Sequence, residues 1–250
     1  MLYMGTNKQD CEVVAAEINR YIKNNCDPNT TKCFDVTVGG ANILDKINCA
    51  TLWGYDISPT LIALHQSMMN QTVLPPPAFT KELWDECYKQ WKILHQHTGP
   101  TLTIEDYSKY AKEQKFHDLA VIGTCEWYGS FGHGGFSQGI APIDSNKRNY
   151  YNEARCNHLE QFMTTNYPYI NFRVKDYAFI DIPKDAIIIA HINSNKNFQW
   201  SGKFDKFRFY RWALNKSRTN PIFIVDDHPL IDIKELKNLK NGKLYFMGKL

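Results

Sequence analysis

A short segment near the N-terminus combines residue types suited to binding a nucleotide-like ligand. Residues 34–42 read Phe-Asp-Val-Thr-Val-Gly-Gly-Ala-Asn, and Asp56 follows the next apolar segment. Glycines let a ligand approach the backbone, free amides at the start of a helix favour an anion, and a carboxylate at the end of a strand can accept ribose hydroxyls. An ordinary strand-to-helix turn has the same spacing, so the pattern alone leaves both interpretations open.

The elements that must position these residues alternate along the chain. The apolar spacing predicts helices over 11–23, 42–47 and 58–69, strands over 32–38 and 51–55, and therefore parallel strands joined by crossover helices. Near the C-terminus, apolar runs and amphipathic stretches alternate again. They predict strands over 170–174, 186–190, 221–225 and 243–247, and helices over 205–213 and 231–240.

Between these two regions the pattern changes. Three prolines at 75–77 mark a boundary, and the segments 81–94 and 103–115 are predicted to be helical. Residues 129–141 are glycine-rich and 144–155 are polar and basic, whereas the aromatic residues of 81–94 have the helical spacing of a packed core. We predict an α/β domain formed by residues 1–70 and 161–250, with a mostly helical insertion over residues 71–160.

Several motifs follow one another in a fixed order. Residues 3–8 read Tyr-Met-Gly-Thr-Asn-Lys, residues 35–41 read Asp-Val-Thr-Val-Gly-Gly-Ala, and residues 55–58 read Tyr-Asp-Ile-Ser. This series resembles phage-type adenine-specific DNA methyltransferases, whose corresponding elements are Tyr-x-Gly-Gly/Ser-Lys, Glu/Asp-Pro-Phe-x-Gly-Gly-Gly and Asp-Ile-Asn. The likeness continues through Arg-Asn-Tyr at 148–150 and Gly-Lys-Phe-Asp at 202–205, and it covers most of the chain.

The resemblance implies a Rossmann-like methyltransferase sheet, S-adenosylmethionine as the cofactor and double-stranded DNA as the partner of a DNA-recognition-like insertion. The cofactor-binding residues that it implies are Lys8, Asp35, Gly39, Gly40, Asp56 and Asp176. The DNA-binding residues that it implies are Ser130, His133, Lys147, Arg148, Tyr150 and Arg155. The alternative for His133 is an ordinary loop histidine, and for the basic residues it is a solvated helix surface.

The resemblance fails where methyl transfer takes place. The family has Cys-Asp-Pro-Pro-Tyr after the fourth strand, and this chain has Ala190 followed by His191, Ile192, Asn193 and Ser194. Transfer to an adenine amine needs a side-chain oxygen and a backbone carbonyl to hold the amine, and an aromatic ring to hold the flipped base. His191 replaces the aspartate and Ser194 replaces the ring. His191 is expected either to pack at the strand end or, less simply, to act as a base.

Three functions are therefore open. The first is a catalytically inactive homologue that acts as a DNA-binding or partner-binding protein. The second is an active adenine-specific methyltransferase in which His191 or Asn193 holds the amine and Phe198 or Trp200 supplies the ring. The third is a phage-type inhibitor of host restriction or methylation machinery. The altered glycine motif, with Ala41 in place of the third glycine, leaves retention or loss of the cofactor open as well.

Composition narrows the class of protein. The net charge is 29 − 26 = +3, which is too small to indicate nucleic-acid binding by itself. Five lysines and one glutamate within 234–250 supply a local charge of +4, which we expect on the exposed face of the helix 231–240. Seven separated cysteines predict reduced thiols without a metal site. The sequence shows neither a secretory signal nor a membrane span, which predicts a cytoplasmic protein, encoded by a phage if the resemblance holds.

Overall fold

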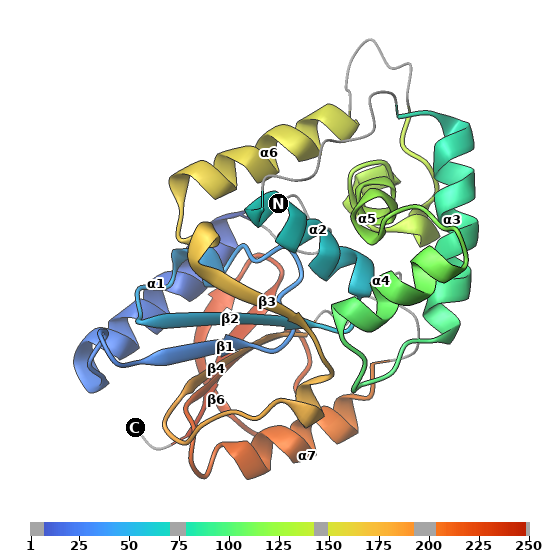
Figure 1. Cartoon of the computed structure of the whole chain (residues 1–250). Helices are drawn as coiled ribbons and strands as arrows, with labels where there is room; N and C mark the ends of the chain where they lie inside the picture. The colour runs from blue at the N-terminus through green and yellow to red at the C-terminus, as the bar shows by residue number, and fades with distance from the viewer. Residues whose placement is uncertain (1–7, 71–78, 143–149, 193–203, 249–250) are drawn as a thin grey trace.

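A single twisted sheet forms the centre of the molecule. The computed structural model describes residues 8–70, 79–142, 150–192 and 204–248. The strands are β1 (Lys32–Asp35), β2 (Thr51–Asp56), β3 (Ile170–Val174), β4 (Ile187–His191), β5 (Ile222–Asp226), β6 (Lys234–Leu239) and β7 (Gly242–Met247). Their order in the sheet is β3-β2-β1-β4-β5-β7-β6 (Figure 1).

Strand direction identifies the fold. The pairs β2–β3, β1–β2, β1–β4 and β4–β5 are parallel, and β7 is antiparallel to both β5 and β6. The order in which successive strands are added to the sheet reverses between β1 and β4, and ligands bind at such a switch point in doubly wound folds. A seven-stranded sheet with this order and an antiparallel β7 is the Rossmann-like methyltransferase sheet, so the predicted fold class is confirmed.

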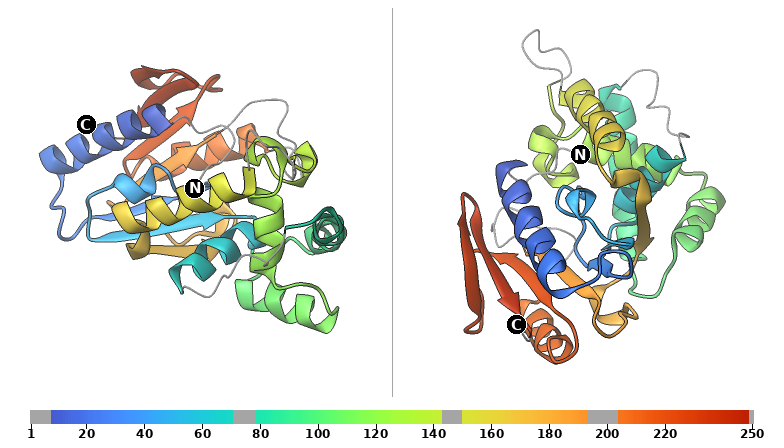
Figure 2. Two further views of the ribbon diagram at one scale, coloured as in Figure 1. Left: turned by 90° about the horizontal axis from the view of Figure 1, so that it is seen from above. Right: turned by 90° about the vertical axis from the view of Figure 1, so that its left-hand side faces the viewer.

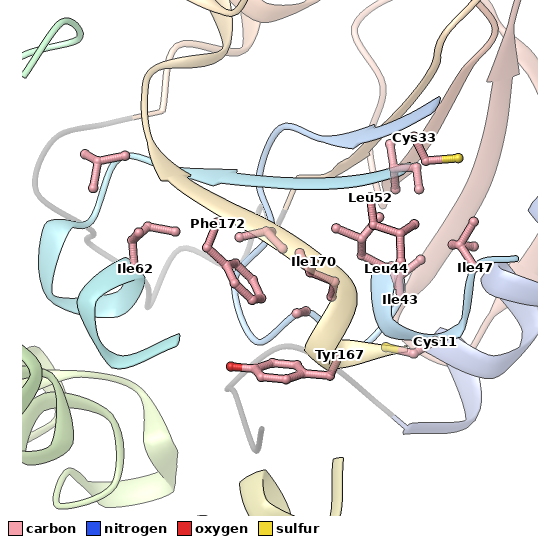
Figure 3. Packing of buried hydrophobic residues seen from close by; sticks show 14 of the residues in the cluster. Cys11, Cys33, Ile43, Leu44, Ile47, Leu52, Ile62, Tyr167, Ile170 and Phe172 are labelled. Carbon is pink, nitrogen blue, oxygen red and sulfur yellow. The ribbon is translucent and has the colours of Figure 1, made fainter. Parts of the chain in front are cut away.

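Helices cover both faces of the sheet (Figures 1 and 2). They are α1 (Lys8–Asn25), α2 (Pro59–Met69), α3 (Lys81–Gln96), α4 (Ile104–Glu113), α5 (Leu119–Trp127), α6 (Tyr150–Thr164) and α7 (Lys206–Lys216). Alternate residues of β4 divide the core: Ile187 and Ile189 share a cluster with α1, whereas Ile188 and Ala190 share one with α7. In Figure 3, Leu44 and Ile47, which follow the glycine turn, lie beside Leu52 of β2 within the first cluster.

The helices between residues 79 and 164 pack on one another and on α2. The α5 helix was not predicted, because all of its residues except Val121 are buried and it has no polar stripe. It lies so close to α2 that a Cβ added at Gly123 would lie 2.4 Å from the carbonyl oxygen of Thr60. Helix α6 crosses the predicted domain boundary at residue 160. The core cluster that contains α1 also contains Trp84 of α3, which is consistent with the packing role predicted for this aromatic residue.

The predicted helix over 231–240 is wrong. Residues 234–239 form β6, which pairs with β7 through a two-residue turn, since Leu239 lies opposite Gly242. A register shift between Glu235 and Lys237 places an extra residue in β6. The bulge spaces the half-buried Leu236 and Leu239 three residues apart, which imitates the period of a helix. The lysines of this segment therefore lie on an edge strand.

None of the helices in the described residues is long and apolar enough to cross a membrane.

Candidate functional site

The carboxyl ends of β1, β2 and β4 bring together the residues that the sequence singled out. The amide of Val36 donates to the carbonyl of Ile189, and the amide of Val38 donates to the carbonyl of Tyr55, both at 2.9 Å or less. These bonds hold the turn after β1 between its two neighbours. The turn itself needs the left-handed region at Gly39, where φ is +47°.

Asp56 lies at the end of β2 and contacts the glycine turn. One carboxylate oxygen accepts from the amide of Gly39 at 3.3 Å and the other from the amide of Ser58 at 3.0 Å. A carboxylate has about four lone-pair sites, so two amides leave acceptor capacity on this half-buried side chain. Ile57 beside it is 43% exposed. A carboxylate acceptor at the end of a parallel strand can accept hydrogen bonds from ribose hydroxyls, which is the role that the sequence analysis predicted for Asp56.

Asp35 is more deeply buried than Asp56, although the resemblance implied cofactor binding for both. Its side chain is 2% exposed and accepts from the amide of Thr37 at 3.0 Å. Burial, and secondarily the charge of Asp56, raises the pKa of Asp35 to about 7. This buried carboxyl therefore stabilises the turn through its bond to the amide of Thr37. Gly40, also predicted to bind the cofactor, accepts through its carbonyl from the Gln161 side chain at 3.2 Å.

His191 occupies the end of β4 and is tied to the turn through its backbone. Its amide donates to the hydroxyl of Thr37 at 2.7 Å, and that hydroxyl also contacts the carbonyl of His191 at 3.3 Å. Burial lowers the pKa of His191 to about 4, so the imidazole is neutral near pH 7. The ring lines a small depression together with Asp10, Cys11, Val14, Ile43, Val225, Leu239 and Asn241.

The rest of the predicted catalytic corner is only partly described. Ile192 is 4% exposed and its amide donates to the carbonyl of Val225 at 2.8 Å, so its side chain belongs to the core. Asn193, Ser194, Phe198 and Trp200 lie outside the described residues.

A buried chain of hydrogen bonds, which no sequence motif predicted, runs from the glycine turn to the helices α5 and α6. The two imidazole nitrogens of His65 lie 2.7 Å from the carbonyl of Gly39 and 2.6 Å from the hydroxyl of Tyr167. That hydroxyl lies 2.6 Å from Nε2 of His158, whose Nδ1 lies 2.5 Å from the hydroxyl of Tyr128. We call these four side chains the tyrosine–histidine relay.

The carbonyl at one end fixes the direction of every bond in the relay. Because the carbonyl of Gly39 can only accept, Nε2 of His65 donates to it and Nδ1 accepts from the hydroxyl of Tyr167. The oxygen of Tyr167 then accepts from Nε2 of His158, and Nδ1 of His158 accepts from Tyr128. Burial lowers the pKa of His65 to about 3 and holds that of His158 well below its usual range, which keeps both rings neutral.

A second buried group joins α5 to the end of β2. The hydroxyl of Thr60 donates to a carboxylate oxygen of Glu126 at 2.5 Å and lies 3.1 Å from the hydroxyl of Ser58, the N-cap of α2. Burial raises the pKa of Glu126 to about 8, so this carboxyl is largely protonated at pH 7.

The residues predicted to bind DNA are only partly described by the structure. Ser130 is fully buried, and its hydroxyl accepts from the indole of Trp84 at 3.4 Å. The DNA-binding role that the resemblance implies for it stays a prediction. Arg155 is exposed on α6, and the ring of Tyr150 lies against Phe131, with centroids 5.7 Å apart. His133 lies in a short 3-10 turn, and Lys147 and Arg148 lie outside the described residues.

The two remaining residues predicted to bind the cofactor lie at the margins of the site. Lys8 is exposed and begins α1, two residues before Asp10, which lines the depression at His191. Asp176 caps the short 3-10 turn after β3, and both of its oxygens contact the guanidinium of Arg208, at 3.2 and 3.3 Å. This ion pair connects the end of β3 to the start of α7.

No cluster of three or more potential metal ligands occurs among residues 8–70, 79–142, 150–192 and 204–248. All seven cysteines are free thiols, and Cys11, Cys33, Cys87 and Cys125 are buried, as expected for reduced cysteines that pack in a core.

The sheet order, the glycine turn and Asp56 together define the class of this protein as a Rossmann-like α/β protein with a methyltransferase fold. No protein-family model matches the sequence, and no curated protein sequence matches it. Among solved structures, the chain is similar to the rRNA methyltransferase aviRa from Streptomyces viridochromogenes, with a TM-score of 0.41 and 8% sequence identity over 98% of this chain and 86% of that one.

Proposed function

We propose that this chain is a nucleic-acid-binding protein with a methyltransferase fold in which adenine methylation has been lost. The observation that carries the proposal is the imidazole of His191 at the end of β4. It lines a depression whose other walls include Val14, Val225 and Leu239, and the low pKa keeps it neutral in these surroundings. A carboxylate that holds an adenine amine has no counterpart at this position.

A methyl-transfer assay tests the loss of activity. The full chain is incubated with adenine-containing duplexes and S-adenosylmethionine labelled in its methyl group, and N6-methyladenine is quantified after digestion. We expect label no higher than in a reaction without protein. Reproducible transfer above that level would overturn the proposal.

Cofactor binding is a separate part of the proposal. Asp56 retains acceptor capacity and Ile57 remains exposed, so we infer that the carboxyl ends of β1 and β2 still bind S-adenosylmethionine or its demethylated product. Calorimetry with both compounds measures this directly, and Asp56→Asn is expected to weaken binding about tenfold, since a charged hydrogen bond to a hydroxyl contributes about 1.5–3 kcal/mol. Glu105→Gln is the matched control, because this exposed carboxylate lies in the first turn of α4, far along the chain from the site. If the Asp56→Asn variant binds the cofactor as tightly as the starting protein, Asp56 does not contact the cofactor.

An active adenine-specific methyltransferase is the alternative, and the bond between Gly39 and Asp56 favours it because the turn keeps its place between β1 and β2. In that case His191→Ala and Phe198→Ala would each abolish transfer measured in the same assay. Unchanged low signal in the starting protein and both variants would exclude it.

A further inference from the structure

The outward side of α7 combines basic and aromatic residues. Between residues 206 and 218 the chain carries Lys206, Arg208, Arg211, Lys216 and Arg218 and no acidic residue. Phe207 is 79% exposed and Leu214 is 47% exposed. We call the surface formed by Phe207, Arg208, Arg211, Leu214 and Arg218 the α7 basic face.

Ion pairs account for two of these cations. Lys206 lies 2.7 Å from Asp226, and Arg208 contacts Asp176. Arg211, Lys216 and Arg218 have no ion pair within the part of the chain that the structure describes. Cations that no carboxylate pairs with raise the local potential and favour a polyanion.

The opposite side of α7 packs on the sheet. Phe209, Tyr210 and Ala213 are buried against β4 and β5 in one cluster. The hydroxyl of Tyr210 donates to Asp226 at 2.6 Å, so the same buried carboxylate holds the helix at two points. A preformed surface loses little conformational entropy when a ligand binds.

Exposed aromatic rings extend this face toward the carboxyl ends of the strands. Phe179 is 47% exposed and Phe204 is 44% exposed. The guanidinium of Arg208 lies 5.4 Å from the ring centre of Tyr177 and 6.0 Å from that of Phe179. The start of α7 and the helices α3 to α5 lie at the same end of the sheet in Figure 1.

We propose that the α7 basic face binds a nucleic-acid strand with unpaired bases. The unpaired cations would contact successive phosphates, and Phe207 with its aromatic neighbours would stack on bases, a combination that single-strand-binding surfaces share. An acidic protein would use the cations without needing exposed rings, so the rings favour nucleic acid. The proposal rests on the nucleic-acid-binding part of the proposed function, and it places the contact on the face of the sheet opposite α1.

The charge part is tested by fluorescence anisotropy of the full chain with a labelled single-stranded DNA of mixed sequence, over a series of salt concentrations. Arg211→Gln combined with Arg218→Gln should weaken binding at least tenfold at low salt. It should also reduce the steepness of log affinity against log salt by about 1.4, because each phosphate contact contributes about 0.7 on single strands and two contacts are lost. Lys234→Gln combined with Lys240→Gln is the matched control, because it removes the same charge from exposed positions of the hairpin. Equal losses in both double variants would overturn the proposal.

The stacking part is tested in the same assay. Phe207→Ala should weaken binding about tenfold and Phe207→Trp should preserve it, since stacking on an aromatic ring contributes about 1–3 kcal/mol per base. Leu214→Ala, an equally apolar truncation on the same face, should change affinity less than threefold. If Phe207→Ala binds as well as the starting protein while the arginine variant does not, the surface binds a polyanion without bases and the nucleic-acid assignment fails.

These outcomes are distinct from those of the proposed function. Binding by the unchanged chain tests nucleic-acid binding as such, and the label in adenine tests catalysis. If the unchanged chain binds DNA and the α7 variants bind equally well, only the α7 basic face is refuted. If the unchanged chain binds neither single strands nor duplexes, the proposed function and this surface both fail.

Discussion

Replacing Tyr167 with phenylalanine removes the central hydroxyl of the tyrosine–histidine relay and keeps its buried ring. The change leaves Nδ1 of His65 without a donor and Nε2 of His158 without an acceptor, in a site where all three side chains have 0% exposure. A buried polar group without a partner costs about 1–3 kcal/mol. For two such groups we expect the free energy of unfolding to fall by about 3 kcal/mol, a large part of the stability of a typical domain.

Urea unfolding followed by tryptophan fluorescence measures this loss. Tyr169→Phe is the matched control, because Tyr169 is 74% exposed and should change stability by less than about 0.5 kcal/mol. Tyr128→Phe removes the terminal donor and orphans only one nitrogen, so it should cost about half as much as Tyr167→Phe. The reasoning is refuted if Tyr167→Phe behaves like the exposed control, or if the terminal variant costs as much as the central one.

Three further predictions follow from single contacts. Glu126 has a folded-state pKa of about 8 against 4.5 for the free group, so its contribution to stability is complete below pH 4.5 and is lost as the pH rises through 8. Between these pH values the free energy of unfolding of Glu126→Gln should therefore rise relative to that of the starting protein. Urea unfolding at several pH values measures this difference. Gly123→Ala forces a Cβ against the Thr60 carbonyl and should lower the free energy of unfolding by about 1–3 kcal/mol. Gly99→Ala is the control, because the nearest atom to its added Cβ is 3.7 Å away, and it should change the same quantity little. Lys115 is exposed with φ of +58°, a conformation that glycine adopts with less strain. Lys115→Gly should therefore stabilise the protein by about 0.5–1 kcal/mol and raise the thermal midpoint measured by differential scanning calorimetry. A lower midpoint would contradict the strain argument.

Periodicity predicted the parallel part of the sheet but not the C-terminal hairpin. Strands β4 and β5 are buried apolar runs, and β1, β2 and β3 are short, mostly buried segments between helices, a pattern that has few other solutions. In β6 the bulge breaks the period of two, and the apolar residues then have helical spacing. A signal for the hairpin was present in Asn241 and Gly242, a pair that is common where two strands reverse direction.

The site was predictable where it depends on neighbouring residues and hidden where it depends on tertiary contact. Gly39 and Asp56 follow consecutive strands of a parallel sheet, so their meeting at one edge follows from the sequence order. Ser130 belongs to a motif-like segment, yet its burial depends on α3 packing over it. His65 and Tyr167 are 102 residues apart and belong to no motif, so only the folded structure brings them together.

The proposed nucleic-acid contact depends on where the charges lie, which the net charge does not show. Two lysines of the C-terminal segment lie beside carboxylates, since Lys243 pairs with Glu235 and Lys237 lies 3.5 Å from Glu17 of α1. Lys234 and Lys237 belong to the edge strand β6, where lysines discourage pairing with another chain. The cations on α7 have a different setting, because Arg211 and Arg218 share an exposed face with Phe207 and have no ion pair within the described residues. A net charge of +3 adds these two populations together, so the arrangement of charges around exposed rings, and not their sum, is what favours a nucleic acid here.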